Sequence, residues 1–320
     1  RTLRLSIDAP KAFFLSKLTY STGYVVDRQN VESGPEWTDH PNGSGPYRLA
    51  RRTRDEILLE ANPRYFRGRP AIEQVHFNLS AGDPVTMYEN DELDVAPVGL
   101  DDFERVQDPA NALHHELVSV PSLNVQYVGL NTNTAPFDDV KVRQAFLHAT
   151  DRLAIVNVMF KKSVQPAWGI LPPEMPGYNP NLPKLGYNPE KARNLLRESR
   201  YGGPEALPPI VFGTSLGGSR LAEALAQMYR ETLGVEIEIQ QAEWGDFLRD
   251  LNRGRYQMFF LGWSADYPDP QDFLDIQFHS GSEGNNTGYS NARVDELLEQ
   301  ARVEQDTDRR MSLYQRAEEI

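Results

Sequence analysis

Cysteine is absent from this 320-residue chain, and positive charge and long apolar runs are scarce. Without cysteine, disulfides, thiolate metal sites and thiol nucleophiles are excluded. The 33 Lys and Arg residues against 46 Asp and Glu residues give a formal net charge of −13, which repels nucleic acid and anionic membrane surfaces. Charges or prolines interrupt every apolar run before the roughly 18 residues that a membrane span requires. We therefore expect no nucleic-acid partner and no membrane span, whereas an ammonium-bearing ligand suits the charge.

The second part of the chain has the pattern of an α/β domain. Alternating strands and helices are expected over residues 209–213, 220–233, 235–240, 244–252 and 255–263. This β-α-β-α-β order predicts a mainly parallel sheet between helices. Further elements are expected as a strand over 124–131, a helix capped by Asp138 or Asp139, and helices over 271–279, after Ser290 or Asn291, and after Asp306.

The first part is richer in strands, and a boundary is plausible near Pro121. The segments YRLARR, DEILLEA and EQVHFNL, between residues 47 and 79, read as three strands separated by turn residues. A short helix and a further strand are expected over 83–100, with Leu93, Val95 and Val98 available to pack. We divide the chain into domains at 1–122 and 123–320.

The most informative stretch, residues 262–270, carries a tryptophan and acidic residues on a stiff turn. The preceding segment YQMFFL is almost continuously apolar, as in a strand covered on both faces. Pro268 and Pro270 restrict the backbone, so Trp263 and Asp266 are presented on a turn with little freedom. Ligands of open α/β sheets bind at the carboxyl ends of strands. An ammonium there would gain a charge-assisted hydrogen bond from Asp266.

Two competing chemistries have weaker support. The segment Gly213-Thr214-Ser215-Leu216-Gly217 fits the G-x-S-x-G pattern of a serine hydrolase, and Asp266 and His279 follow in the hydrolase order. However, glycines 217 and 218 prolong the loop, where a nucleophile elbow needs an abrupt turn, so we favour an ordinary strand-to-helix loop. Asp266, Asp269, Asp272 and Asp275 lack the glycine and terminal glutamate of a calcium loop. We expect no catalytic residue, no metal and no cofactor.

Segments along nearly the whole chain resemble one family. They are GSGPYRL (43–49), ILLEANPRYFRGRPAIEQVHF (57–77), YVGLNTNTAPFDDVKVRQAFLHATDR (127–152), PPEMPGY (172–178), GYNPEKARNLL (186–196), GWSADYPDPQDFL (262–274) and NNTGYSNARVDELLEQA (285–301). They resemble the extracellular solute-binding proteins of peptide ABC importers, the oligopeptide and dipeptide binding proteins of family 5. The resemblance implies a two-lobed, periplasmic-binding-protein-like α/β fold in which residues 1–122 are part of lobe 1 and 123–320 form lobe 2.

The resemblance also implies the roles of individual residues. Asp266 is the aspartate of the GW-x-x-D motif and would hold the α-ammonium of a peptide. The backbone of Gly262, Trp263 and Ser264 would pair with the peptide main chain, with the Trp263 side chain lining the pocket. Ligand contacts are also expected from three further residues, Tyr267, Asn131 and Asn133.

The function that follows is a non-enzymatic receptor. It would work outside the cytoplasm, secreted or lipid-anchored, and deliver peptides to the permease subunits of an ABC transporter. Membrane association would come only through the permease or an upstream lipid anchor. Relatives with the same architecture take oligosaccharides, nickel complexes or heme, so another solute is the alternative, and a hydrolase using Ser215 is a more distant one. Because family members are longer, we expect a fragment that lacks the N-terminal part of lobe 1 and the C-terminal return segment.

Overall fold

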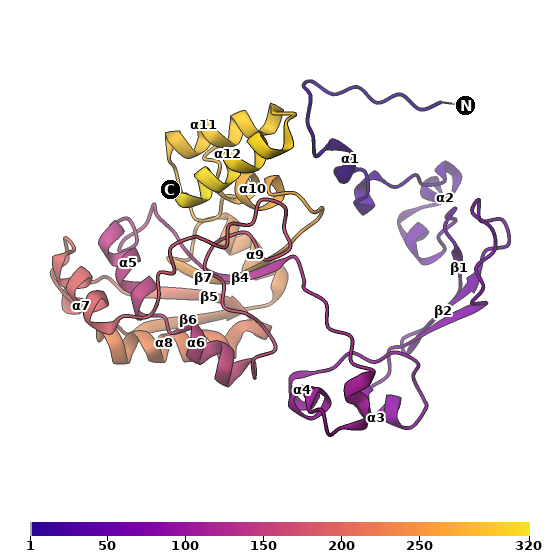
Figure 1. The fold of residues 1–320 in the computed structure, drawn as a ribbon, viewed down its shortest axis with the longest axis horizontal. Coiled ribbons are helices and arrows are strands. Elements are labelled where there is room, and N and C mark those ends of the chain that lie inside the picture. Colours follow the sequence, from indigo (N-terminus) through magenta and orange to yellow (C-terminus); the bar gives the residue numbers. More distant parts are fainter. Residues whose placement is uncertain (1) are drawn as a thin grey trace. The chain divides into compact units, whose positions relative to one another are not determined.

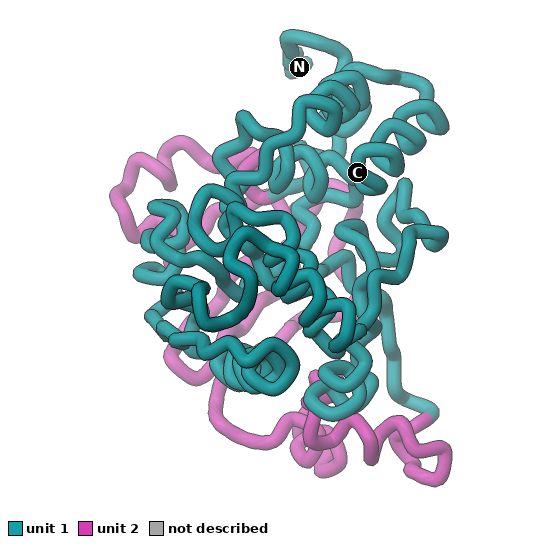
Figure 2. The backbone as a smooth tube through the Cα atoms, turned by 90° about the vertical axis from the view of Figure 1, so that its left-hand side faces the viewer, with its two compact units in different colours: residues 1–20, 115–320 teal, residues 21–114 magenta. Residues whose placement is uncertain are grey.

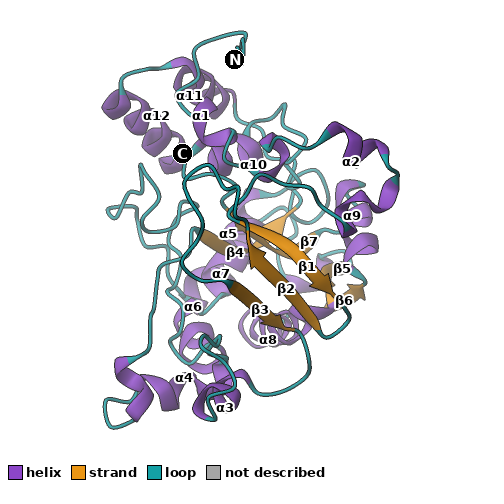
Figure 3. Cartoon of the chain, turned by 90° about the vertical axis from the view of Figure 1, so that its right-hand side faces the viewer, coloured by secondary structure: helices purple, strands orange, loops and turns teal. Residues whose placement is uncertain are grey.

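The computed structural model describes residues 2–320, which pack into two compact units. One unit joins residues 2–20 to His115–Ile320, and the other is Ser21–His114 (Figure 2). Each unit contains its own β-sheet (Figure 1, Figure 3). The predicted lobe boundary after residue 122 stays a prediction, because compact packing is a different criterion from the lobes of a binding protein.

The smaller unit is built on a three-stranded antiparallel sheet in the order β1-β2-β3. Its strands β1 (Tyr47–Arg52), β2 (Glu56–Ala61) and β3 (Gln74–Asn78) confirm the three predicted strands. The helices of this unit are α2 (Arg28–Glu32), α3 (Pro84–Glu89) and α4 (Leu100–Gln107). The strand predicted within 83–100 is wrong: the segment between α3 and α4 is irregular. Val95 is 83% exposed, because this segment has no sheet on which to pack.

The larger unit contains a four-stranded sheet in the order β4-β7-β5-β6. Its strands are β4 (Asn124–Leu130), β5 (Ile210–Ser215), β6 (Ile237–Ala242) and β7 (Met258–Ser264). β5 runs parallel to both β6 and β7, whereas β4 pairs antiparallel with β7 along its whole length. The predicted mainly parallel arrangement is therefore confirmed, with β4 as its antiparallel edge.

Helices cover both faces of this sheet. On one face α5 (Val140–Ala149), α7 (Pro189–Glu198) and α8 (Ser219–Leu233) enclose a core that includes Phe212 and Met258. On the other face α9 (Trp244–Asn252) packs on Tyr256 and Phe259. The apolar segment before residue 262 is thus buried from both sides, as its composition predicts. The chain passes from β6 across β5 to β7, so the strand order reverses next to β5.

Local signals place the helix ends where the sequence predicts them. The Asp139 carboxylate accepts the Lys141 N–H at the start of α5 (2.8 Å). Asn291 caps the helix Ala292–Val303 in the same way. α8 ends at Gly234, whose φ of 71° is the left-handed conformation that glycine adopts without strain.

The remaining helices gather around a third core. A π-helical turn, Gln271–Asp275, runs directly into α10 (Ile276–Phe278), and α11 (Ala292–Val303) and α12 (Thr307–Glu319) pack on its buried Phe273 and Leu274. Two short helices complete the unit, α1 (Phe14–Lys17) in the N-terminal segment and α6 (Arg152–Ala154) after α5. Within residues 2–320, no helix has both the length and the apolar character needed to span a membrane.

Candidate functional site

The carboxyl end of β7 leaves one backbone edge open. β7 meets β5 only at the pairs Phe212–Met258 and Gly213–Phe259, while on its other side it stays paired with β4 as far as Ser264. Within residues 2–320, no strand pairs with Gly262, Trp263 or Ser264 on the β5 side. Free N–H and C=O groups of this kind are a template for an added strand. The open edge also lies at the reversal of strand order, where α/β sheets bind ligands.

Asp266 follows this open edge by two residues and is exposed. The charge of its carboxylate is the main cause that raises the pKa of Tyr20. Its backbone N–H donates to Asp272 Oδ2 at 3.1 Å. Asp266 is therefore held by its backbone while its carboxylate remains reachable from solvent.

Asp272 lies beneath Asp266 in the π-helical turn and is completely buried. Its Oδ2 also accepts the indole Nε1–H of Trp263 at 3.1 Å. The Trp263 side chain is half-buried and packs against the third core. Burial raises the pKa of Asp272, and the charge of Asp266 acts in the same direction, while the charge of Lys17 opposes both.

Tyr267 points into the protein and not towards the open edge. It is 5% exposed, and its hydroxyl donates to Gln271 Oε1. Burial, assisted by the charges of Asp272 and Asp269, raises its pKa well above the usual range. The ligand contact expected of Tyr267 stays a prediction, but the side chain is occupied with closing the turn.

A buried ion pair anchors the loop after Asp266 to helix α12. Arg310 Nη1 lies 2.9 Å from Asp269 Oδ2, and its Nη2 contacts the other carboxylate oxygen. Arg310 also donates to the carbonyl of Ala301 and to the Tyr314 hydroxyl, each at 3.3 Å. Asp269 in turn accepts the Gln271 N–H at 3.0 Å. The loop is therefore fixed on both sides of Asp266, by strand β7 and by this clamp.

The N-terminal segment forms another border of the site. The guanidinium of Arg310 lies 5.5 Å from the ring centre of Phe13, which is buried. Lys17 Nζ lies 5.4 Å from the ring centre of Tyr267 and 5.0 Å from that of Phe13. These contacts bring the Lys17 ammonium to Tyr267, which lies 250 positions later in the sequence and next to Asp266.

A row of polar side chains lies on the sheet surface at the end of β7, on the β4 side and opposite the open edge. Ser264 Oγ accepts a hydrogen bond from Asn124 Nδ2, and Asn124 Oδ1 accepts one from Gln126 Nε2 at 3.0 Å. Gly262 has no side chain, and a Cβ there would lie 2.3 Å from Gln126 Nε2. Only glycine lets the Gln126 amide lie across the strand.

Asn131 and Asn133 lie at the opposite end of β4. Because the strands are antiparallel, Asn124 pairs with Ser264 and Leu130 with Met258, six residues or about 20 Å away. Asn131 Oδ1 accepts the Asn133 N–H at 3.0 Å and forms a turn. The structure therefore does not bring these two residues together with Asp266, and the ligand contacts expected of them stay a prediction.

The alternative chemistries do not assemble. His279 bonds the Gly281 N–H and Glu299 through its two ring nitrogens, which leaves neither for Ser215. Ser215 ends β5, and a 3-10 turn separates it from α8. Among the residues described, no group of three or more His, Cys, Asp and Glu side chains is arranged to hold a metal. Asp275, like Asp269, is paired with an arginine, here Arg302 at 2.6 Å.

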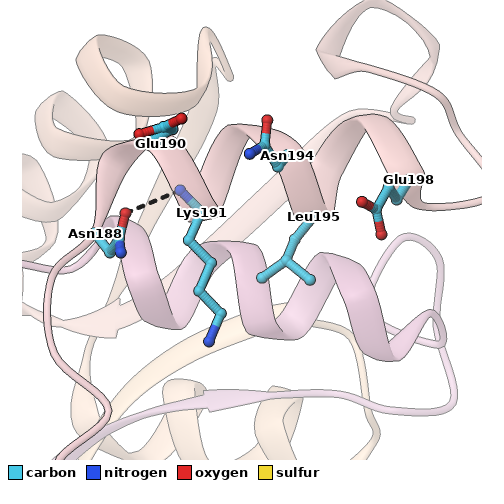
Figure 4. A pocket seen from close by; sticks show the side chains of 6 residues that line it. All are labelled: Asn188, Glu190, Lys191, Asn194, Leu195 and Glu198. Carbon is cyan, nitrogen blue, oxygen red and sulfur yellow. Dashed lines mark hydrogen bonds between the residues drawn. The ribbon is translucent and has the colours of Figure 1, made fainter.

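A hollow lies elsewhere, along the exposed side of α7 (Figure 4). Its volume is about 350 Å³, and it is open to solvent. It is lined by six residues of that helix and its cap: Asn188, Glu190, Lys191, Asn194, Leu195 and Glu198. Small ligands bind in enclosed, mostly apolar pockets. This depression is open and mostly polar, so we do not regard it as the ligand-binding site.

Sequence reasoning missed several members of the site. Asn124 and Gln126 carry a readable signal, because polar residues alternate with apolar ones at the start of β4. Lys17 and Tyr20 carry none, because nothing local relates them to Asp266. The buried position of Asp272 could not be distinguished by pattern from the neighbouring acids.

A free strand edge beside an exposed carboxylate offers both main-chain groups and a negative charge to a ligand. Comparison with known families agrees: the model for bacterial extracellular solute-binding proteins, family 5 (middle region), matches residues 1–285. The chain belongs to this family, as its sequence motifs predict.

Named relatives are binding proteins. The chain is 28% identical over 98% of its length to the probable di/tripeptide-binding protein 5 of Pseudomonas aeruginosa, and 27% identical over its whole length to the dipeptide-binding protein of Escherichia coli. It is 30% identical over its whole length to heme-binding protein A of Haemophilus influenzae. The chain spans 60% to 62% of the length of these relatives.

Solved structures confirm the predicted α/β fold of a periplasmic binding protein. The murein tripeptide binding protein MppA of Escherichia coli superimposes with a TM-score of 0.80 at 24% identity, over 98% of this chain and 63% of that one. A periplasmic oligopeptide-binding protein from Borrelia burgdorferi gives a TM-score of 0.78 at 27% identity, over 97% of this chain and 63% of that one.

Proposed function

We propose that this chain forms the ligand-binding part of an extracytoplasmic receptor that captures peptides for an ABC importer. The peptide main chain adds as a strand to the open edge at Gly262–Ser264, and its α-ammonium meets Asp266. The observation that carries the proposal is the combination of an unpaired backbone edge and an exposed carboxylate two residues beyond it. Main-chain pairing gives affinity without regard to side-chain identity, so broad peptide selectivity follows.

The partners and location belong to the same proposal. The receptor delivers its peptide to the permease subunits of the importer and works at the outer face of the cell membrane or in the periplasm. The names of the dipeptide- and di/tripeptide-binding relatives support this assignment. In this proposal the receptor contacts the membrane through the permease or through a lipid anchor.

The test compares free and blocked peptides on the intact protein. Titration calorimetry with one tripeptide, and with its N-acetylated form, measures the contribution of the ammonium. A hydrogen bond to a charged group contributes about 1.5–3 kcal/mol, so acetylation, or Asp266→Asn with the free peptide, should weaken binding by about 10- to 150-fold. Glu190→Gln on α7 is the control and should leave affinity unchanged. Equal affinity for both peptides on the wild-type protein would refute the ammonium role.

The alternative solute is heme, favoured by the 30% identity to heme-binding protein A. Mass spectrometry and absorbance spectra of the freshly purified intact protein separate the two possibilities. Co-purified peptides support the proposal above, whereas a stoichiometric Soret band would replace it.

A further inference from the structure

One oxygen atom of Asp272 contacts both residues on which the proposed peptide site depends, Trp263 and Asp266. Asp272 Oδ2 accepts both the Trp263 indole N–H and the Asp266 backbone N–H, each at 3.1 Å. The donors come from the end of β7 and from the turn that follows it, nine and six residues before Asp272. Hydrogen bonds to an ionised acceptor are stronger and more strictly oriented than neutral ones. The position of Asp272 therefore sets where the indole and Asp266 lie relative to each other.

This arrangement is costly for the fold. Asp272 is completely buried, and its second oxygen, Oδ1, has no hydrogen-bond partner within residues 2–320. A buried, incompletely satisfied carboxylate costs folding free energy, and such groups concentrate at functional sites. Burial and the nearby charge of Asp266 both raise the pKa of Asp272, which is the electrostatic sign of this cost.

The surroundings of Asp272 hold it in place without neutralising it directly. The turn that carries it is fixed by the Arg310–Asp269 pair three residues earlier. The charge of Lys17 lowers the pKa of Asp272, and Lys17 Nζ lies 5.4 Å from the ring centre of Tyr267. Asp272 is thus held in place, and both hydrogen bonds that its Oδ2 accepts come from residues of the site.

We propose that Asp272 is the positioning residue of this site: its Oδ2 holds the Trp263 indole and the Asp266 backbone in the arrangement that captures a ligand ammonium. The inference rests on the proposed function and adds to it a residue that does not touch the ligand. Asp266 supplies the negative charge, and Asp272 fixes the position of that charge relative to the ligand ammonium. Loss of Asp272 should therefore reduce discrimination between free and acetylated peptides more than it reduces binding of the main chain.

The decisive readout is the ratio of the Kd for an N-acetylated tripeptide to the Kd for the free tripeptide, measured on the intact protein. Asp272→Ala removes both acceptor contacts and should lower this ratio about tenfold, or to one. Asp272→Asn keeps an oxygen acceptor for both N–H groups and should keep the ratio within about threefold of the wild-type value. Asp250→Ala, which removes another buried carboxylate in α9, is the matched control and should leave the ratio unchanged.

The outcomes separate the two proposals. A wild-type protein without preference for the free peptide would remove the proposed function itself. A wild-type preference that persists unchanged in Asp272→Ala, or that is lost equally in Asp272→Asn, would overturn the positioning role alone. If Asp272→Ala does not fold, Trp263→Phe decides, because it deletes only the indole donor and keeps an aromatic ring. A ratio lowered about threefold or more in Trp263→Phe supports the inference, and an unchanged ratio overturns it.

Discussion

Replacing Arg310 by methionine should destabilise the larger unit strongly, because it leaves a buried carboxylate without its partner. The Arg310 and Asp269 side chains are 5% and 11% exposed, and their planar groups meet through two contacts. Breaking a buried ion pair of this kind costs about 3–5 kcal/mol, against at most about 1 kcal/mol for an exposed pair. Methionine keeps most of the packing against Phe13 and Tyr314, so the loss is chiefly electrostatic.

The assay is urea unfolding followed by circular dichroism, with two comparison variants. Arg293→Met removes an exposed pair with Glu296 in α11 and should cost less than about 1 kcal/mol. In the double variant Arg310→Met with Asp269→Leu no charge remains buried, so it should be more stable than Arg310→Met alone. A loss below about 1 kcal/mol for Arg310→Met would refute the reasoning, since it would mean that water or another group compensates Asp269.

Two further predictions concern the sheet and the buried acid. Gly129→Ala should destabilise by about 1–3 kcal/mol or more in the same urea assay, because its Cβ would lie 2.1 Å from the buried Phe259 ring, while Gly245→Ala, with nothing within 4 Å, should be neutral or stabilising. Asp272→Asn should be more stable than the wild type at pH 7, with the difference shrinking as pH falls towards the ordinary aspartate range. The sign follows because burial raises the folded-state pKa of Asp272, so folding takes up a proton and ionisation opposes it; a difference that is constant from pH 4 to pH 8 in unfolding curves would contradict it.

Sequence pattern was enough for most elements of the larger unit. The apolar periodicity of α5 and α8, the Asp139 cap of α5 and the Gly234 cap of α8 fix where these helices run, because capping and burial act within a few residues. The same reasoning failed within 83–100, where a strand with Leu93, Val95 and Val98 packed was expected after the short helix. Alternation is satisfied only if a sheet edge is available, and that depends on distant parts of the chain.

The candidate site divides in the same way. Trp263, Asp266 and the stiff turn were visible as a motif, and the family followed from motifs spread along the chain. The open edge of β7 was not visible, because it results from β5 diverging after Gly213. Neither was the distance of Asn131 from the site, which follows from the antiparallel register of β4.

The sequence by itself determined most of the secondary structure of the larger unit, the acidic character of the protein and its membership of a solute-binding family. Only the tertiary structure decided which groups surround Asp266. Tyr20 lies near its carboxylate, Asp272 accepts its backbone N–H, and Lys17 and Arg310 contact the turn that follows it. The physical reason is that helix caps and periodicity are local, whereas hydrogen bonds and ion pairs between residues up to about 250 positions apart exist only once the sheet and its helices have packed.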